Sequence, residues 1–111
     1  MEKLVRDKMP EFCENGAHMG YTKMNYRIAD PKEKLILLLD KLIEEAQEVK
    51  DAFKTDAYIS NVPFELADVA EVSRAILAYV NLVPTDLERC RITKRSERGG
   101  FEKGIVWDGN K

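Results

Sequence analysis

Two long stretches in which apolar residues recur every three or four positions constrain the fold of this 111-residue chain most strongly. The first begins at Asp30-Pro31-Lys32-Glu33, which offers an N-cap acid, a proline at the first helical position and a glutamate at the third. The apolar positions that follow are Leu35, Leu38, Leu39, Leu42, Ala46, Val49 and Phe53. This spacing lines one face of an α-helix and predicts a helix from Asp30 to about Phe53, followed by a connector over 55–60.

The second stretch predicts a helix from Ser60 or Asn61 to about Leu82, with Pro63 in its first turn. Pro84 ends this helix. The sequence Thr85-Asp86-Leu87-Glu88 has the pattern of a capping box and predicts a third helix that ends near Gly99-Gly100.

The two ends of the chain are less regular. A short N-terminal helix is predicted with Asp7 as its cap, Pro10 in its first turn and Gly16 at its end. Alternating polarity over 22–28 and over 101–107 is typical of a short strand or an extended arm.

These elements predict an all-α fold in one domain, residues 1–111. We expect an antiparallel bundle of three main helices, with a short N-terminal helix and short extended arms. Three helices of this size cover one another poorly, so we expect dimerisation to complete a four-helix-type bundle.

Bulk composition excludes several classes of function. With 34% charged and 44% hydrophobic residues the chain resembles ordinary globular proteins, and its net charge of −2 gives no general attraction to a nucleic-acid polymer. No apolar run approaches the length of a membrane span, and the first residues lack the apolar core of a signal peptide. Cys13 and Cys90 have no metal-binding spacing, so we expect two reduced thiols in a cytoplasmic protein, although sequence leaves a disulfide open.

Two pairs of acidic residues carry the chemistry: Glu45 with Glu48, and Glu65 with Asp68. Each pair is spaced i,i+3 and projects from one side of its helix. On a helical wheel, Glu45 lies about 70° from the centre of its apolar stripe and Glu48 about 130°. Neighbouring Glu44 falls on the far side, so we expect it to be solvated.

On the next helix Glu65 falls inside the apolar arc, and Asp68 falls at its edge. A buried carboxylate needs a cation, either a structural lysine or arginine or a metal ion. Antiparallel packing would gather all four acids, which repel one another unless a divalent cation intervenes. Because every ligand is a carboxylate, Mg²⁺ is favoured over Zn²⁺, and Mn²⁺ is the alternative to Mg²⁺. His18 is the only histidine, so a di-iron site is disfavoured.

Basic residues form two groups. Arg91, Lys94, Arg95 and Arg98 share a stripe of the third predicted helix, and Lys3, Arg6 and Lys8 precede the first. Each group is either a solvated charged face or a phosphate-binding surface.

Four segments together resemble the all-α NTP pyrophosphohydrolases, which include MazG-like and phosphoribosyl-ATP pyrophosphohydrolase-like proteins. In chain order these segments are KLVRDKMP (residues 3–10), KLIEEAQE (residues 41–48), ELADVAEV (residues 65–72) and KRSERGGF (residues 94–101). They span nearly the whole chain. Met9 stands where isoleucine is usual in this family, a change of packing alone.

The resemblance implies Mg²⁺ ligands at Glu45, Glu48, Glu65 and Asp68 and hydrolysis of a nucleotide substrate, an NTP, dNTP or related nucleotide, to the monophosphate and pyrophosphate. It implies that Glu45 or Glu48 activates the water, a choice that spacing leaves open. It also implies a homodimer or homotetramer, and phosphate binding by basic residues of the first and last segments: Lys3, Arg6, Lys8, Lys94, Arg95 and Arg98. The alternatives are a phosphoribosyl-ATP pyrophosphohydrolase, from which the first and last segments lean away, and a non-catalytic helical interaction module.

Overall fold

The computed structural model describes residues 2–14, 23–54 and 58–109, and side chains for all of these except 58–60. The four helices of the described chain are α1 (Met9–Glu14), α2 (Pro31–Ala52), α3 (Tyr58–Tyr79) and α4 (Pro84–Arg98). The described residues contain no strand, so the all-α prediction is confirmed for them. None of these helices is both long enough and apolar enough to cross a membrane.

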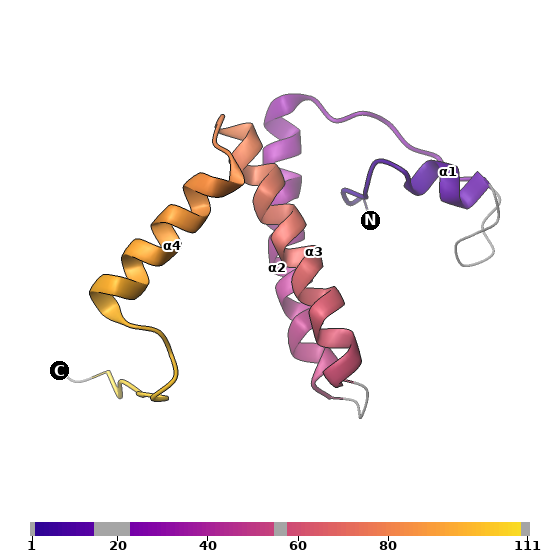
Figure 1. The fold of residues 1–111 in the computed structure, drawn as a ribbon. Coiled ribbons are helices and arrows are strands. Elements are labelled where there is room, and N and C mark those ends of the chain that lie inside the picture. The colour runs from indigo at the N-terminus through magenta and orange to yellow at the C-terminus, as the bar shows by residue number, and fades with distance from the viewer. Residues whose placement is uncertain (1, 15–22, 55–57, 110–111) are drawn as a thin grey trace.

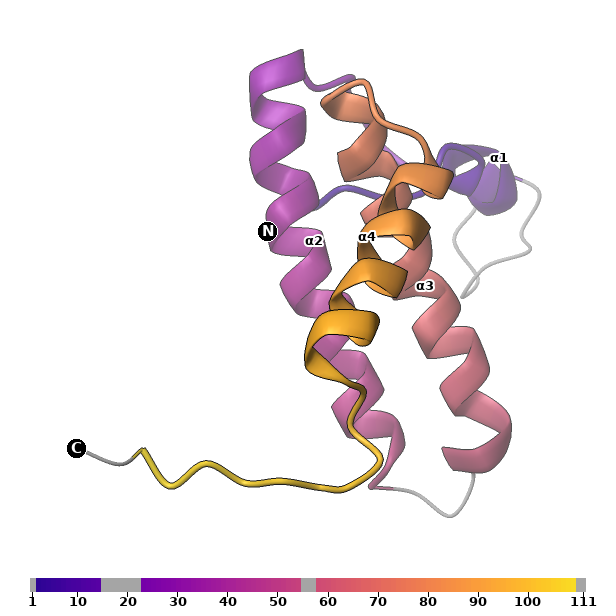
Figure 2. The ribbon, with the colours of Figure 1, turned by 60° about the vertical axis from the view of Figure 1, so that its left-hand side comes forward.

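Helices α2 and α3 form an antiparallel hairpin and lie side by side along their length (Figures 1 and 2). The start of α2 follows the prediction, because the Asp30 carboxylate accepts a hydrogen bond from the Glu33 backbone N–H at 2.9 Å. The reciprocal half of the predicted capping box is not formed. Instead, the Glu33 carboxylate accepts two hydrogen bonds from the Arg27 guanidinium, each 2.7 Å long.

Helix α4 diverges from this hairpin and meets α3 only near their junction (Figure 1). None of its residues is buried. The radius of gyration is 17.7 Å, whereas a compact chain of this length has about 13 Å. A three-helix bundle is therefore not closed by a single chain. The buried apolar side chains among the described residues are Cys13, Leu38 and Val72.

Several predicted boundaries shift. Helix α4 begins at Pro84, and the Asp86 carboxylate accepts a hydrogen bond from the Val83 N–H at 2.8 Å, so the expected cap at Thr85 is wrong. Helix α3 begins at Tyr58, which shortens the connector and places Pro63 inside the helix. Helix α1 begins at Met9, with Lys8 rather than Asp7 before it.

Two predicted details at the ends resolve in favour of irregular structure. Residues 23–30 and 104–109 form no strand, because no neighbouring segment pairs with them in the described chain. Gly99 ends α4 as predicted, with φ +83° and its N–H donating to the Arg95 carbonyl at 2.8 Å.

Cys13 is buried in α1 and Cys90 is exposed on α4, and both are free thiols. Gly16, His18 and Thr22 lie outside the described residues.

Candidate metal centre

The hairpin brings the four predicted acids into one cluster. Glu45 and Glu48 extend from α2, and Glu65 and Asp68 extend from α3. Each residue offers one carboxylate oxygen, and these oxygens all lie within 4.8 Å of one another. We call these four residues the acid cluster. Antiparallel packing of two helices that each carry an i,i+3 pair produces this arrangement.

Glu45 is the buried member of the acid cluster, with 6% of its surface exposed. Its Oε2 atom is buried and has no hydrogen-bond partner among the described residues. Burial raises the pKa of Glu45, and the neighbouring carboxyl of Glu48 raises it further, while Lys41 opposes the shift. A hydrogen bond between Glu45 and Glu48 forms only if one carboxyl keeps its proton, so the ionised pair leaves Oε2 unsatisfied.

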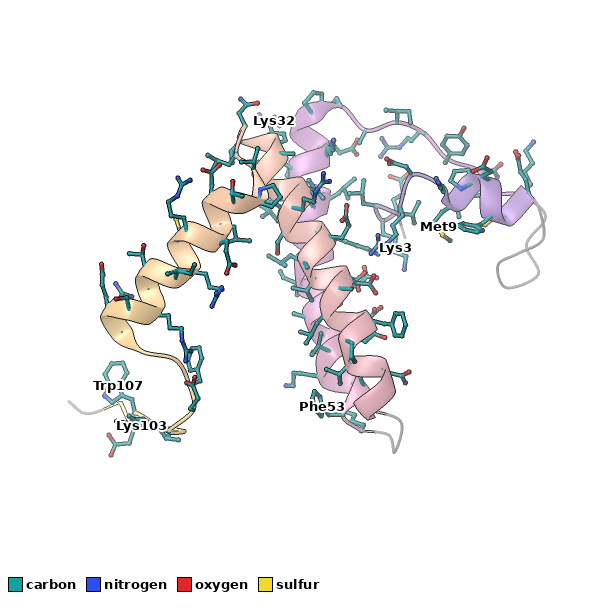
Figure 3. All side chains as sticks on the ribbon, viewed as in Figure 1. Lys3, Met9, Lys32, Phe53, Lys103 and Trp107 are labelled. Atoms are coloured by element: carbon teal, nitrogen blue, oxygen red, sulfur yellow. The ribbon has the colours of Figure 1, made fainter. Side chains whose placement is uncertain are left out.

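The helical wheel ranked these acids incorrectly. It placed Glu65 within an apolar arc and Glu45 at a border, whereas Glu65 is partly exposed and Glu45 is buried. The wheel considers each helix alone. In the structure, the segment Glu2–Lys8, which we call the lead segment, passes over α2 beside Glu45, and its Lys3 side chain lies next to the hairpin in Figure 3.

Two cations already contact the acid cluster. Arg6 of the lead segment donates from Nη2 to Asp68 Oδ1 at 2.6 Å. Lys41, one turn before Glu45 on α2, places Nζ 3.4 Å from Glu45 Oε1. Sequence reasoning assigned no role to Lys41, although its i,i+4 spacing to Glu45 was the signal that could have found it.

Glu44 was predicted to be solvated, but in the structure its carboxylate forms two ion pairs. Its Oε1 atom lies 3.3 Å from Lys3 Nζ and 3.2 Å from Lys41 Nζ. Burial acts to raise the pKa of Glu44, but the hydrogen bonds from Lys41 and Lys3 outweigh it and lower that pKa. Glu44 therefore helps to hold the lead segment against α2.

A cavity of about 660 Å³ opens between the lead segment and the hairpin. Its charged lining includes Arg6, Lys8, Lys41, Glu45 and Asp68. Cations and carboxylates thus share one concave surface, an arrangement suited to a polyphosphate with a metal ion.

The predicted basic residues of α4 are not brought to this cavity by the single chain. Lys94, Arg95 and Arg98 are exposed, and none of them lines the cavity. Arg95 pairs instead with Glu102 of the tail, and Arg91 pairs with Glu88. Of the six predicted phosphate-binding residues, Arg6 and Lys8 line the cavity, whereas Lys3 does not line it and pairs with Glu44.

The donor set of the acid cluster fits a divalent cation. Fully ionised, the four carboxylates carry four negative charges, while Arg6 and Lys41 supply two positive charges, so two negative charges remain. Among the described residues, no ion pair reaches Glu48 or Glu65, and Glu45 keeps a buried oxygen without a partner. Hard carboxylate oxygens suit Mg²⁺ or Mn²⁺.

The raised pKa of Glu45 predicts how the stability of the cation-free protein depends on pH. In the unfolded chain Glu45 ionises near its ordinary value of 4.5, whereas the folded protein keeps the proton to higher pH. Stability should therefore fall as pH rises from 4.5 to the raised pKa and then level off. Glu45→Gln should remove this loss, so in a chelator its melting temperature should exceed wild type by a margin that grows with pH across that window.

Thermal melts from pH 4 to 8 test this expectation, with Glu71→Gln as a control on the exposed side of α3. A melting-temperature difference between Glu45→Gln and wild type that stays constant with pH would contradict it.

No protein-family model, curated protein or solved structure matches this chain. The assignment of a metal centre therefore stands on the chemistry of the acid cluster itself.

Proposed function

We propose that this protein is a Mg²⁺-dependent nucleotide pyrophosphohydrolase that converts a nucleoside triphosphate, or a related nucleotide, to the monophosphate and pyrophosphate. The observation that carries the proposal is the buried, unpartnered Glu45 oxygen within a cluster of four carboxylates. Such an oxygen is costly unless a cation occupies the site. The segment resemblance described above supplies the reaction class.

In this proposal Glu45, Glu48, Glu65 and Asp68 hold Mg²⁺, with Mn²⁺ as a substitute. A bound divalent cation offsets the negative charge that develops on phosphate oxygens during transfer. Arg6 and Lys8, which line a cavity together with Glu45 and Asp68, bind the phosphate chain and orient it. Water forms the new bond to the α-phosphorus, and the bond from that phosphorus to the α–β bridging oxygen breaks. Pyrophosphate leaves with that oxygen, and these cationic side chains stabilise its charge.

The attacking water must lose a proton to a nearby carboxylate. Glu45 and Glu48 are the candidates, because they lie one turn apart on α2 and both belong to the acid cluster. Burial raises the pKa of Glu45, which makes its carboxylate a stronger base, whereas the side chain of Glu48 is exposed to solvent. A proton passed from water to this pair can therefore leave through Glu48.

Pyrophosphate release tests the function directly. The purified protein should be incubated with Mg²⁺ and a panel of NTPs, dNTPs, damaged nucleotides and phosphoribosyl-ATP, with EDTA as the control. We expect equal amounts of monophosphate and pyrophosphate from at least one substrate, and none in EDTA. Absence of cleavage, together with absence of divalent-cation binding, would reject the enzyme.

Thermal melts with and without Mg²⁺ and nucleotide address a second candidate, a non-catalytic helical interaction module. The observation that favours it is that Arg6 and Lys41 already pair with two of the four acids. In that case the acid cluster is an ion-pair network that joins the lead segment to the hairpin, and neither Mg²⁺ nor a nucleotide changes its melting temperature.

We also propose that the protein works as a homodimer or homotetramer. Large apolar side chains on all three long helices are exposed in the single chain, among them Ile36, Leu39, Ile43, Phe64, Leu87 and Ile92. A second copy would cover these faces and complete a four-helix-type bundle. In such an oligomer, the basic residues of α4 in one chain would approach the acid cluster of another chain.

Ile43 offers a test of association, since it is 71% exposed on α2. Ile43→Glu should shift the protein from an oligomer to a monomer, because a charge in an apolar interface is costly to desolvate. Analytical ultracentrifugation measures the change, with Lys50→Glu as a control at an exposed polar position of the same helix. A wild-type monomer at all concentrations would contradict the proposal.

A further inference from the structure

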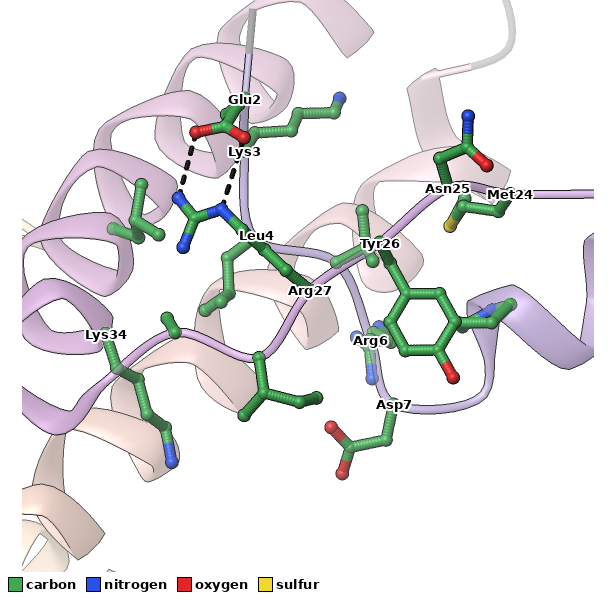
Figure 4. A pocket seen from close by; sticks show the side chains of 15 residues that line it. Glu2, Lys3, Leu4, Arg6, Asp7, Met24, Asn25, Tyr26, Arg27 and Lys34 are labelled. Carbon is green, nitrogen blue, oxygen red and sulfur yellow. Dashed lines mark hydrogen bonds and ion pairs between the residues drawn. The ribbon is translucent and has the colours of Figure 1, made fainter.

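The lead segment is tied to the rest of the molecule by three ion pairs. Lys3 pairs with Glu44 of α2, Arg6 pairs with Asp68 of α3, and Glu2 lies 2.9 Å from Arg27. Figure 4 shows the Glu2–Arg27 pair, with Arg6 and Asp7 further along the same segment. Of these three, only the Arg6 pair ends on a member of the acid cluster.

Arg6 therefore pairs with a carboxylate, that of Asp68, which a divalent cation would also need as a ligand. Its Nη2 atom is 2.6 Å from Asp68 Oδ1, a charge-assisted hydrogen bond between residues 62 positions apart in the chain. A cation bound by all four acids withdraws charge from Asp68 and repels the guanidinium. Cation binding must therefore weaken or break this pair.

The released guanidinium has a second possible partner within the same cavity. The Arg6 side chain is 59% exposed, so it can turn without disturbing a packed core. It lines the cavity beside Lys8, and its planar fork matches two phosphate oxygens. A phosphate group in the cavity would pair with the Arg6 guanidinium and replace its lost ion pair with Asp68.

We propose that Arg6 is an exchange residue that pairs with Asp68 in the cation-free protein and with substrate phosphate when a divalent cation is bound. This proposal rests on the proposed cation site and adds that Arg6 makes the affinity for the cation depend on phosphate. The cation alone competes with Arg6, and phosphate relieves that competition. Cation and phosphate should then each raise the affinity for the other by the same factor.

Isothermal titration of the full-length protein with Mn²⁺ tests this exchange without relying on turnover. The titration is done with and without inorganic phosphate, which complexes free Mn²⁺ weakly. For wild type we expect phosphate to tighten Mn²⁺ binding. In Arg6→Gln we expect Mn²⁺ alone to bind about 3- to 10-fold more tightly than in wild type, because its competitor is gone. We also expect phosphate to tighten Mn²⁺ binding by a smaller factor in that variant than in wild type, because, of Arg6 and Lys8, only Lys8 is left to bind it.

Two further variants make the result specific. Arg74→Gln removes a guanidinium that lines the same cavity but pairs with Glu71, outside the acid cluster, and should behave as wild type. Arg6→Lys keeps the positive charge but lacks the planar guanidinium. Its affinity for Mn²⁺ alone should therefore be close to that of wild type, whereas phosphate should tighten Mn²⁺ binding less than in wild type. Circular dichroism checks that each variant retains its helices.

The outcomes separate this inference from the proposed function. If wild type and Arg6→Gln bind Mn²⁺ equally and phosphate tightens both alike, the exchange is overturned while the metal site stands. If wild type binds no divalent cation, the proposed function fails and the exchange fails with it. An equal gain of Mn²⁺ affinity in Arg74→Gln would also overturn the inference, because it would show a general charge effect.

Discussion

Glu65→Gln is expected to reduce Mg²⁺-dependent pyrophosphate release by about 100- to 1,000-fold, because it removes a charged ligand from the acid cluster. Glu65 extends from α3 toward the two glutamates of α2, and no ion pair reaches it among the described residues. Glutamine keeps its shape and loses its charge. The loss should therefore appear in activity and cation affinity rather than in folding.

Asp51→Asn is the matched control for this experiment. Asp51 lies on α2 outside the cavity, undergoes the same loss of charge and is exposed, with Lys54 3.1 Å away. Its activity should stay within about twofold of wild type, in keeping with the small effect of removing a surface ion pair. Activity retained in Glu65→Gln with unchanged helicity would refute the assigned cluster.

Leu38→Ala is expected to lower the free energy of unfolding by about 2–5 kcal/mol. Leu38 is 3% exposed and is one of the few buried apolar side chains among the described residues. A typical domain has a total stability of about 5–15 kcal/mol, so this loss is a large share of it. Urea denaturation followed by circular dichroism, at low protein concentration, measures the change.

Leu39→Ala provides the comparison, since Leu39 is the next residue on α2 and is 45% exposed. In a monomer its cost should be well below that of Leu38→Ala. A cost that grows with protein concentration would show that a second copy covers this face. Equal costs at every concentration would contradict the core assigned to the single chain.

The helices could be predicted because their signals are local. Asp30, Pro31 and the leucines that follow define α2 through contacts within a few residues of one another. Boundaries shifted where several residues competed for one role, as at Val83, Thr85 and Asp86. Alternating polarity over 22–28 could not decide between strand and loop, because a strand exists only if another segment pairs with it.

The clustering of the four acids could be predicted from the sequence, but the surroundings of each acid could not. The i,i+3 spacing selected the four acids, and the hairpin brings them together. Sequence alone could not show that Glu45 is the buried one, that Arg6 reaches Asp68, or that Glu44 is paired. Each depends on where the lead segment crosses the helices, which no helical wheel contains.

The sequence by itself determined the helical content, the two long amphipathic helices and the four acids that they carry, since propensity, capping and periodicity act over single turns of a helix. The tertiary structure decided which acid loses its contact with water and which cations stand beside it. It also decided that α4 leaves the hairpin, so that a single chain does not close a bundle. Burial and ion pairing depend on segments far apart in the chain, so they become defined only when those segments pack together.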